Sequence, residues 1–127
     1  MSERGAHVLV VEDNERNSRL ACAVLEVAGM TPHSVATGHE ALAHCRGEAP
    51  DVVLLDVQLP DRSGVEVLAD LRADPATAGI PVAALTAFAM AGDRERLLAS
   101  GFDEYISKPI DVATFAQTVS ALIRDRA

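Results

Sequence analysis

The stretch VVLLDVQLPDRSGVEVLADL, residues 52–71, holds the clearest strand, turn and helix of this sequence. Val52 to Leu55 is a short apolar run, which is the pattern of a strand buried on both faces of a sheet. A turn at Leu59-Pro60-Asp61 follows, and Ser63 with Glu66 forms a capping box at the start of a helix. The apolar residues of this helix include Val65, Leu68 and Leu71. This stretch therefore predicts one strand–helix unit.

Two similar units precede it in the chain. His7 to Val11 is nearly all apolar, so it predicts a second buried strand. The apolar residues that recur at helical spacing between this strand and Gly29 are Leu20, Val24, Val27 and Ala28. Thr31 to Ala36 predicts a weaker strand at an edge of the sheet, and Thr37 with Glu40 forms a capping box for the helix after it. That helix contains Ala41, Leu42 and Cys45.

Two further units follow. Pro81 to Thr86 predicts a strand, and Asp93 to Ser100 predicts a helix that ends at Gly101. Glu104 to Ile106 predicts a short fifth strand. The last helix has a broad apolar stripe at i, i+3, i+4 and i+7 spacing, formed by Val112, Phe115, Ala116, Val119, Leu122 and Ile123.

Five strands that alternate with five helices indicate an α/β fold, in which a parallel sheet is covered by helices on both faces. Because crossovers between parallel strands are right-handed, we expect a doubly wound, flavodoxin-like sheet with strand order 2-1-3-4-5. In such sheets functional groups gather at the carboxyl ends of the strands, next to the point where strand order reverses. Here that point lies between the first and third strands.

Size and charge narrow the class of protein. A chain of 127 residues is long enough for one sizeable core and too short for two, so residues 1–127 are expected to form a single domain with no effector domain after the last helix. The formal net charge of −8 disfavours nucleic acid and anionic membrane surfaces as partners. The sequence shows no secretory signal or membrane span, which predicts a cytoplasmic protein, and Cys22 and Cys45 are expected to be reduced.

Charged and hydroxyl side chains stand at the carboxyl ends of the predicted strands. Glu12 and Asp13 follow the first strand, Asp56 the third and Thr86 the fourth, and Lys108, the single lysine, follows the fifth. Three carboxylates in one crevice repel each other unless a cation joins them, and hard oxygen donors favour Mg²⁺. With an ammonium and a hydroxyl opposite, the set fits phosphoryl transfer onto a carboxylate. Asp56, on the central strand, is the best-held nucleophile, and Glu12 and Asp13 are better placed as metal ligands.

Four motif blocks at these strand ends resemble those of response-regulator receiver domains, the family that includes CheY. The blocks are Val10-Val11-Glu12-Asp13-Asn14, Leu54-Leu55-Asp56-Val57-Gln58-Leu59-Pro60, Leu85-Thr86-Ala87 and Ile106-Ser107-Lys108-Pro109. Each block alone is weakly specific, but four in the same order over nearly the whole chain are highly specific. The stretch from Ala87 to Ile110 is most similar to single-domain receivers of the DivK type.

The resemblance implies a role for each site residue. Asp56 is the phosphoacceptor, and Thr86 and Lys108 hold the phosphoryl oxygens. Mg²⁺ is bound by Asp13, by Asp56 and by the backbone carbonyl of Gln58, and Glu12 helps through water. The Lys108-Pro109 peptide is expected to be cis. In this reading the protein is a phosphoacceptor switch with only self-phosphorylation and autodephosphorylation chemistry, and no other enzymatic activity.

The resemblance also implies how the switch signals. Thr86 swings toward the phosphoryl group, Tyr105 enters the vacated space, and the face built by the helix 93–100, the strand 104–106 and the last helix is remodelled. The expected partners are a histidine kinase or histidine phosphotransferase and a downstream protein that binds this face, with the chain itself a monomer or weak dimer. Phe88, two residues after Thr86, is expected to slow hydrolysis by limiting water.

Other readings of the same residues exist. The three acidic residues could merely cap helices or end strands, Thr86 could be an ordinary strand residue, and Tyr105 could be a half-buried core aromatic. The four histidines, at positions 7, 33, 39 and 44, are expected to be surface or edge residues. A flavodoxin shares the expected fold, but the first loop of a flavodoxin must bind a phosphate. In this chain Glu12 and Asp13 would repel that phosphate.

Two further functional classes compete with the switch. A phosphatase of the haloacid dehalogenase type needs an aspartate two residues after its nucleophile as general acid, where this chain has Gln58. A receiver that has lost phosphorylation would act only as a docking module.

Overall fold

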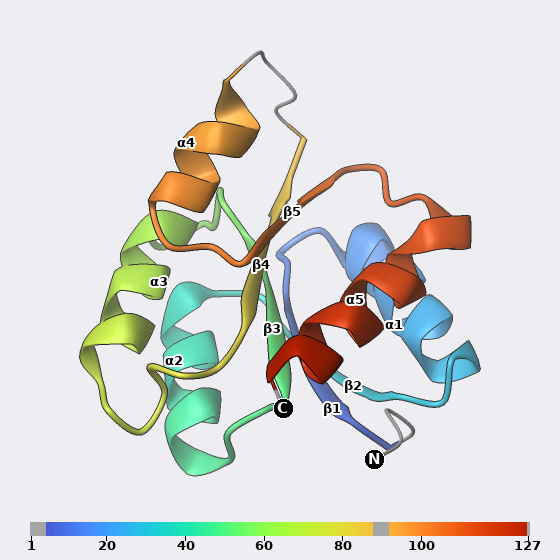
Figure 1. The fold of residues 1–127 in the computed structure, drawn as a ribbon, viewed down its shortest axis with the longest axis horizontal. Coiled ribbons are helices and arrows are strands. Elements are labelled where there is room, and N and C mark those ends of the chain that lie inside the picture. Colours follow the sequence, from blue (N-terminus) through green and yellow to red (C-terminus); the bar gives the residue numbers. More distant parts are fainter. Residues whose placement is uncertain (1–4, 88–91, 127) are drawn as a thin grey trace.

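The computed structural model describes residues 5–87 and 92–126, without the side chains of residues 125 and 126. Five strands and five helices alternate along it (Figure 1). The strands are β1 (His7–Val11), β2 (Thr31–Val35), β3 (Val52–Asp56), β4 (Val82–Thr86) and β5 (Glu104–Ser107). The helices are α1 (Glu15–Val27), α2 (Gly38–Gly47), α3 (Gly64–Ala73), α4 (Asp93–Ala99) and α5 (Val112–Arg126). The α/β fold and its five units are confirmed, with strand bounds within about one residue of those predicted.

The strands form one parallel sheet in the order β2-β1-β3-β4-β5, as predicted. All residues of β3 and β4 are buried, whereas β2 and β5, at the two edges, are mostly exposed or half-buried. The predicted edge position of β2 is therefore confirmed. Figure 1 shows α2, α3 and α4 on one side of the sheet and α1 and α5 on the other.

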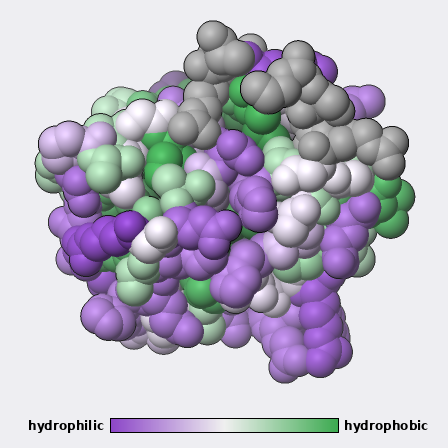
Figure 2. Space-filling model, turned by 90° about the horizontal axis from the view of Figure 1, so that it is seen from below, coloured by the Kyte–Doolittle hydropathy of each residue, from purple (hydrophilic) through white to green (hydrophobic). Residues whose placement is uncertain are grey.

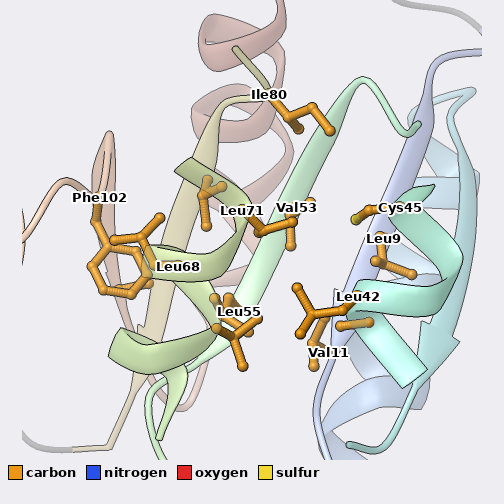
Figure 3. Close-up of a cluster of buried hydrophobic side chains, with 14 of the residues drawn as sticks. Leu9, Val11, Leu42, Cys45, Val53, Leu55, Leu68, Leu71, Ile80 and Phe102 are labelled. Atoms are coloured by element: carbon orange, nitrogen blue, oxygen red, sulfur yellow. The ribbon is translucent and has the colours of Figure 1, made fainter. Parts of the chain in front are cut away.

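Two hydrophobic clusters fill the space between the sheet and these helix layers. The first joins β1, β3 and β4 to α2, α3 and α4, with Phe102 and Leu68 side by side at one end (Figure 3). The second packs Ala21 and Leu25 of α1 and Phe115 and Val119 of α5 onto the other face. The central strands thus bury their side chains on both faces, which explains their nearly continuous apolar sequence.

The buried face of α1 differs from the set of apolar residues that recur at helical spacing in its sequence. The helix forms where expected, but its buried residues are Ser18, Ala21 and Leu25, whereas Leu20 is 41% exposed and Val27 is 91% exposed. Apolar residues at helical spacing therefore located the helix and misidentified its buried face. The small Ala21 and Ser18 allow α1 to lie close to the sheet, and a pattern based on large apolar residues overlooks them.

Helix ends follow the predicted signals closely. Gly29 has φ = 89°, its N–H donates to the carbonyl of Glu26, and the next N–H, from Met30, donates to Leu25, which is the Schellman arrangement. Thr37 accepts a hydrogen bond from the N–H of Glu40, as a capping box requires. Ser63 also caps its helix, but through the N–H of Val65 instead of Glu66, so the second capping box was wrong in that detail.

The face of the molecule seen in Figure 2 is mainly hydrophilic. Figure 2, which views the molecule from below, shows hydrophilic residues over most of this face and apolar residues in small, separate patches. The large apolar residues that are exposed in the described part of the chain are Leu20, Val27 and Val112. None of the helices described is both long enough and apolar enough to span a membrane.

Candidate phosphoryl-transfer and metal site

The sheet brings the predicted residues to one edge because its strands are parallel. Asp56 ends β3, Thr86 ends β4, and Lys108 follows directly after β5. In the register of the sheet, Val11 pairs with Leu55 and Asp56 pairs with Leu85, so the residues after β1 stand beside Asp56. Glu12 and Asp13 are the residues that follow Val11.

Lys108 connects the two buried carboxylates of this edge. Its Nζ donates to Asp56 Oδ2 at 2.9 Å and to Glu12 Oε1 at 3.0 Å. The Lys108 side chain is 15% exposed, that of Asp56 6% and that of Glu12 1%. The Lys108 backbone N–H also donates to the carbonyl of Thr86 at 2.8 Å, and the Lys108-Pro109 peptide is cis, as expected. The ammonium is therefore held between two carboxylates in a largely water-excluded place.

Burial and the neighbouring charges shift the pKa values of the ionisable groups in the pocket. Burial raises the pKa of Glu12, and its contact with Asp56 raises it further, although Lys108 and Asn17 pull it down. Burial alone would lower the pKa of Lys108, but its bonds to Asp56 and Glu12 outweigh burial and raise the pKa. One ammonium thus compensates only part of the negative charge.

The donor set fits a hard divalent cation. Glu12, Asp13 and Asp56 each offer a carboxylate oxygen, and these three oxygens lie within 4.8 Å of one another. Glu12 Oε2 is buried and has no hydrogen-bond partner among the described residues, so one anionic oxygen in the pocket is still available to a ligand. Asp13 is exposed and gives the site an open side. Oxygen ligands with access for water are the environment that Mg²⁺ prefers.

The loop after β3 closes another side of the pocket. The N–H of Gln58 donates to Asp56 Oδ1 at 2.9 Å, which places the Gln58 backbone against the Asp56 carboxylate. An open recess of about 950 Å³ lies between this loop and the acidic residues. Its lining includes Asn14, Ser63 and Lys108 as well as the carboxylates. Such a recess can admit a hydrated ion together with a phosphoryl group.

Sequence reasoning missed one residue of this site. Asn17, on the first turn of α1, donates from Nδ2 to Glu12 Oε1 at 2.9 Å and so shares that oxygen with Lys108. No motif block contains Asn17. Its spacing of five residues from Glu12, at the start of a helix with Asn14 as N-cap, was the signal that could have identified it.

Of the two residues expected to act as the switch, Thr86 lies beside the pocket and Tyr105 lies further along the sheet. Thr86 is buried at the end of β4, next to Lys108. Tyr105, on β5, is half-buried and packs against the first hydrophobic cluster, which is also where a simple core aromatic would lie. Phe88, expected to limit access of water, falls outside the described residues.

Of the histidines and cysteines, none lies at the pocket. His7, His33 and His39 are exposed and His44 is half-buried, as expected for surface or edge positions. Both cysteines are free thiols, and burial raises the pKa of Cys45 to about 11.

Comparisons with known proteins agree with this geometry. A family model described as the response regulator receiver domain matches residues 8–120. The polar-differentiation response regulator DivK of Brucella ovis is 44% identical over 118 residues, which cover 93% of this chain and 96% of that protein. DivK of Brucella anthropi has the same identity and coverage.

Solved structures have the same fold. A putative response regulator from Chloroflexus aurantiacus superposes with a TM-score of 0.90 at 26% identity, covering 95% of this chain and 99% of that one. The receiver domain of the sensor histidine kinase PA1611 from Pseudomonas aeruginosa has a TM-score of 0.86 at 32% identity, covering 94% and 98% of the two chains. In that structure a magnesium ion is coordinated in the active site cleft.

Proposed function

Because this chain belongs to the response regulator receiver domain family, we propose that it is a single-domain response regulator of a two-component phosphorelay, with Asp56 as phosphoacceptor. The observation that carries the proposal is the Lys108 ammonium, 2.9 Å from Asp56 and 3.0 Å from Glu12, in a pocket that Asp13 completes. Flavodoxins and phosphatases of the haloacid dehalogenase type belong to other protein families. The family match therefore favours neither of these two alternatives.

Asp56 is well placed to be the nucleophile. A carboxylate oxygen of Asp56 attacks the phosphorus of a phosphohistidine donor, the new O–P bond forms as the N–P bond breaks, and the electron pair stays on the donor imidazole. The incoming phosphoryl group adds negative charge beside two carboxylates, so Lys108 turns its hydrogen-bonding capacity toward the new oxygens. Thr86, beside Lys108, offers a hydroxyl to the same group. Water later hydrolyses the acyl phosphate and restores Asp56.

Mg²⁺ is the cofactor we propose for this pocket. Asp13, Asp56 and the Gln58 carbonyl would hold it, with Glu12 helping through water. The unpartnered Glu12 oxygen and the three clustered carboxylates support this assignment. When bound, the ion neutralises charge on the transferring phosphoryl oxygens. The carboxylates of Glu12 and Asp13 would keep the ion next to Asp56.

The output surface in this proposal is the α4-β5-α5 face. Phosphorylation draws Thr86 toward the phosphoryl group, Tyr105 moves inward, and the face changes its affinity for a downstream protein. Arg94 of α4 lies 3.3 Å from Glu104 of β5, so an ion pair already links two elements of this face. The upstream partner is a histidine kinase or histidine phosphotransferase, and the setting is the cytoplasm.

Phosphorylation can be tested directly by intact mass spectrometry. Incubation with acetyl phosphate and Mg²⁺ is expected to add one phosphoryl group to the wild-type protein, and chelation of Mg²⁺ with EDTA to abolish most of the gain. The variant Asp56→Asn is expected to gain nothing.

A matched control uses Asp70→Asn, which changes an aspartate of α3 that pairs with Arg62 and lies away from the pocket. This variant should be phosphorylated like the wild type. Absence of any phosphoryl gain in the wild type, or an equal gain in Asp56→Asn, would contradict the proposal and favour a docking module without phosphorylation.

A further inference from the structure

One oxygen of the buried Glu12 carboxylate accepts two hydrogen bonds, and Asn17 is one of the two donors. Asn17 Nδ2 donates to Glu12 Oε1 at 2.9 Å, and Lys108 Nζ donates to the same oxygen at 3.0 Å. The other oxygen, Oε2, is buried and has no hydrogen-bond partner among the residues that the structure describes. The two oxygens of this carboxylate therefore have unequal environments.

This inequality fixes the orientation of the carboxylate. The terminal torsion of a glutamate side chain is broad and roughly twofold, so its own preference does not decide where each oxygen points. The two donors on Oε1 decide it, and they leave Oε2 as the oxygen that a ligand can use. Because the amide of Asn17 is neutral, it holds Glu12 without cancelling the negative charge that attracts a cation.

Asn17 is held in place by the start of α1 and has no substitute nearby. Its backbone N–H donates to Asn14 Oδ1 at 3.0 Å, in the N-cap of the helix. Asn17, Glu12 and Lys108 also line a small hollow of about 20 Å³ beside the acidic pocket. The other residues of its lining, which have no side-chain donor, are Val10, Leu20, Ala21, Leu85, Pro109 and Ile110. No other side chain of this lining can therefore replace the amide of Asn17.

We propose that Asn17 is a positioning residue for Mg²⁺. Its amide holds Glu12 Oε1, so that Oε2 stays free to accept a hydrogen bond from a water molecule on the ion. This inference rests on the proposed function, in which Glu12 helps to bind Mg²⁺ through water. It adds a residue that acts on the ion only through Glu12.

The test measures the affinity for Mg²⁺ by NMR titration of Asn17→Leu. Leucine removes the amide but keeps the volume of the side chain, and the cap survives because it uses the backbone of residue 17. Removal of a hydrogen-bond partner from a metal ligand typically costs about 10–100-fold in affinity, so for a ligand that acts through water we expect a dissociation constant about three- to tenfold higher. Asn17→Ala is a second variant, in which a water molecule can replace the amide, and its dissociation constant should lie between those of the wild type and Asn17→Leu.

Leu20→Ala is the matched control, because it changes an apolar residue of the same hollow. This variant should bind Mg²⁺ like the wild type.

A double-mutant cycle shows whether Asn17 acts through Glu12. Glu12→Gln removes the negative charge of the carboxylate, so adding Asn17→Leu to it should change the dissociation constant by less than about twofold. Phosphorylation by acetyl phosphate gives a second readout. The rate for Asn17→Leu should be reduced at low Mg²⁺ and should return to within about twofold of the wild-type rate at saturating Mg²⁺, because the weakened step is binding of the ion.

The proposal and the proposed function can fail separately. Wild-type affinity in Asn17→Leu, an equal loss in Leu20→Ala, or a full loss on adding Asn17→Leu to Glu12→Gln would overturn this proposal alone. A wild-type protein that binds no Mg²⁺ would overturn the proposal together with the assignment of Mg²⁺ to the pocket.

Discussion

Gly64, the first residue of α3, shows how closely the backbone approaches the phosphoacceptor candidate. A Cβ at this position would lie 2.3 Å from the carbonyl oxygen of Asp56 and 2.9 Å from Cα of Val57. Both are backbone atoms, so they cannot rotate away, and α3 or the end of β3 would have to shift. We expect Gly64→Ala to lower the free energy of unfolding by about 1–3 kcal/mol, the usual cost of overpacking, as measured by urea denaturation.

Gly47, at the end of α2, provides the control. A Cβ there meets no atom within 4 Å, so Gly47→Ala should be neutral or should stabilise the protein by up to about 1 kcal/mol. Equal destabilisation by the two variants would mean that the contact with Asp56 does not determine the choice of glycine.

At the residue scale, the sequence predicted the contact of Lys108 with Asp56, because the carboxyl ends of parallel strands must meet. It did not predict Asn17 or the reason for Gly64, since these depend on how the chain turns in three dimensions. The contact between the stacked rings of His33 and His44 was also missed. It requires the register of β2 against β1 and the position of α2, neither of which follows from the spacing of histidines along the chain.

Among the elements, α2 is held by a loop far from it in the sequence. Asp61, between β3 and α3, accepts hydrogen bonds at its two oxygens from the N–H groups of Gly38, at 2.9 Å, and His39, at 3.0 Å. Free N–H groups at a helix start favour such an anion. The loop after Asp56 and the start of α2 are therefore coupled.

This coupling predicts a pH-dependent loss of stability in Asp61→Ala. The bonds to Gly38 and His39 lower the pKa of Asp61 from its ordinary value of 3.8, and Arg62 adds to the effect. A lowered folded-state pKa gives stability that is present above the unfolded value and is lost as pH falls through the folded one. We therefore expect Asp61→Ala to have a lower melting temperature at pH 7, and the difference from wild type to shrink below about pH 4.

Glu66→Ala changes an exposed acidic residue on α3 and should show no comparable effect. A difference for Asp61→Ala that stays constant down to pH 2 would show that the charge of Asp61 has no part in it. The sequence placed Asp61 correctly in a turn, but its bonding partner lies 23 residues earlier, beyond the range of any local signal.

At the scale of the whole molecule, the strand order was predictable because right-handed crossovers leave few ways to wind five short parallel strands. The sheet then divides the interior into two clusters, one under α2, α3 and α4 and one under α1 and α5. Apolar residues at helical spacing located α1, but they did not identify its buried face. Small residues such as Ala21 pack there beside Leu25, and their burial depends on the approach of the helix to the sheet.

This division predicts which core substitutions act independently. Leu42 and Val11 belong to the first cluster (Figure 3) and Val119 to the second. Truncation of each to alanine should cost about 2–3 kcal/mol. Across the sheet, Leu42→Ala with Val119→Ala shares no partners, so their costs should add to within about 0.5 kcal/mol, whereas Leu42→Ala with Val11→Ala should deviate from additivity by more. Urea denaturation of the two double-mutant cycles measures both values. Coupling across the sheet as strong as coupling within the first cluster would mean that the two cores act as one.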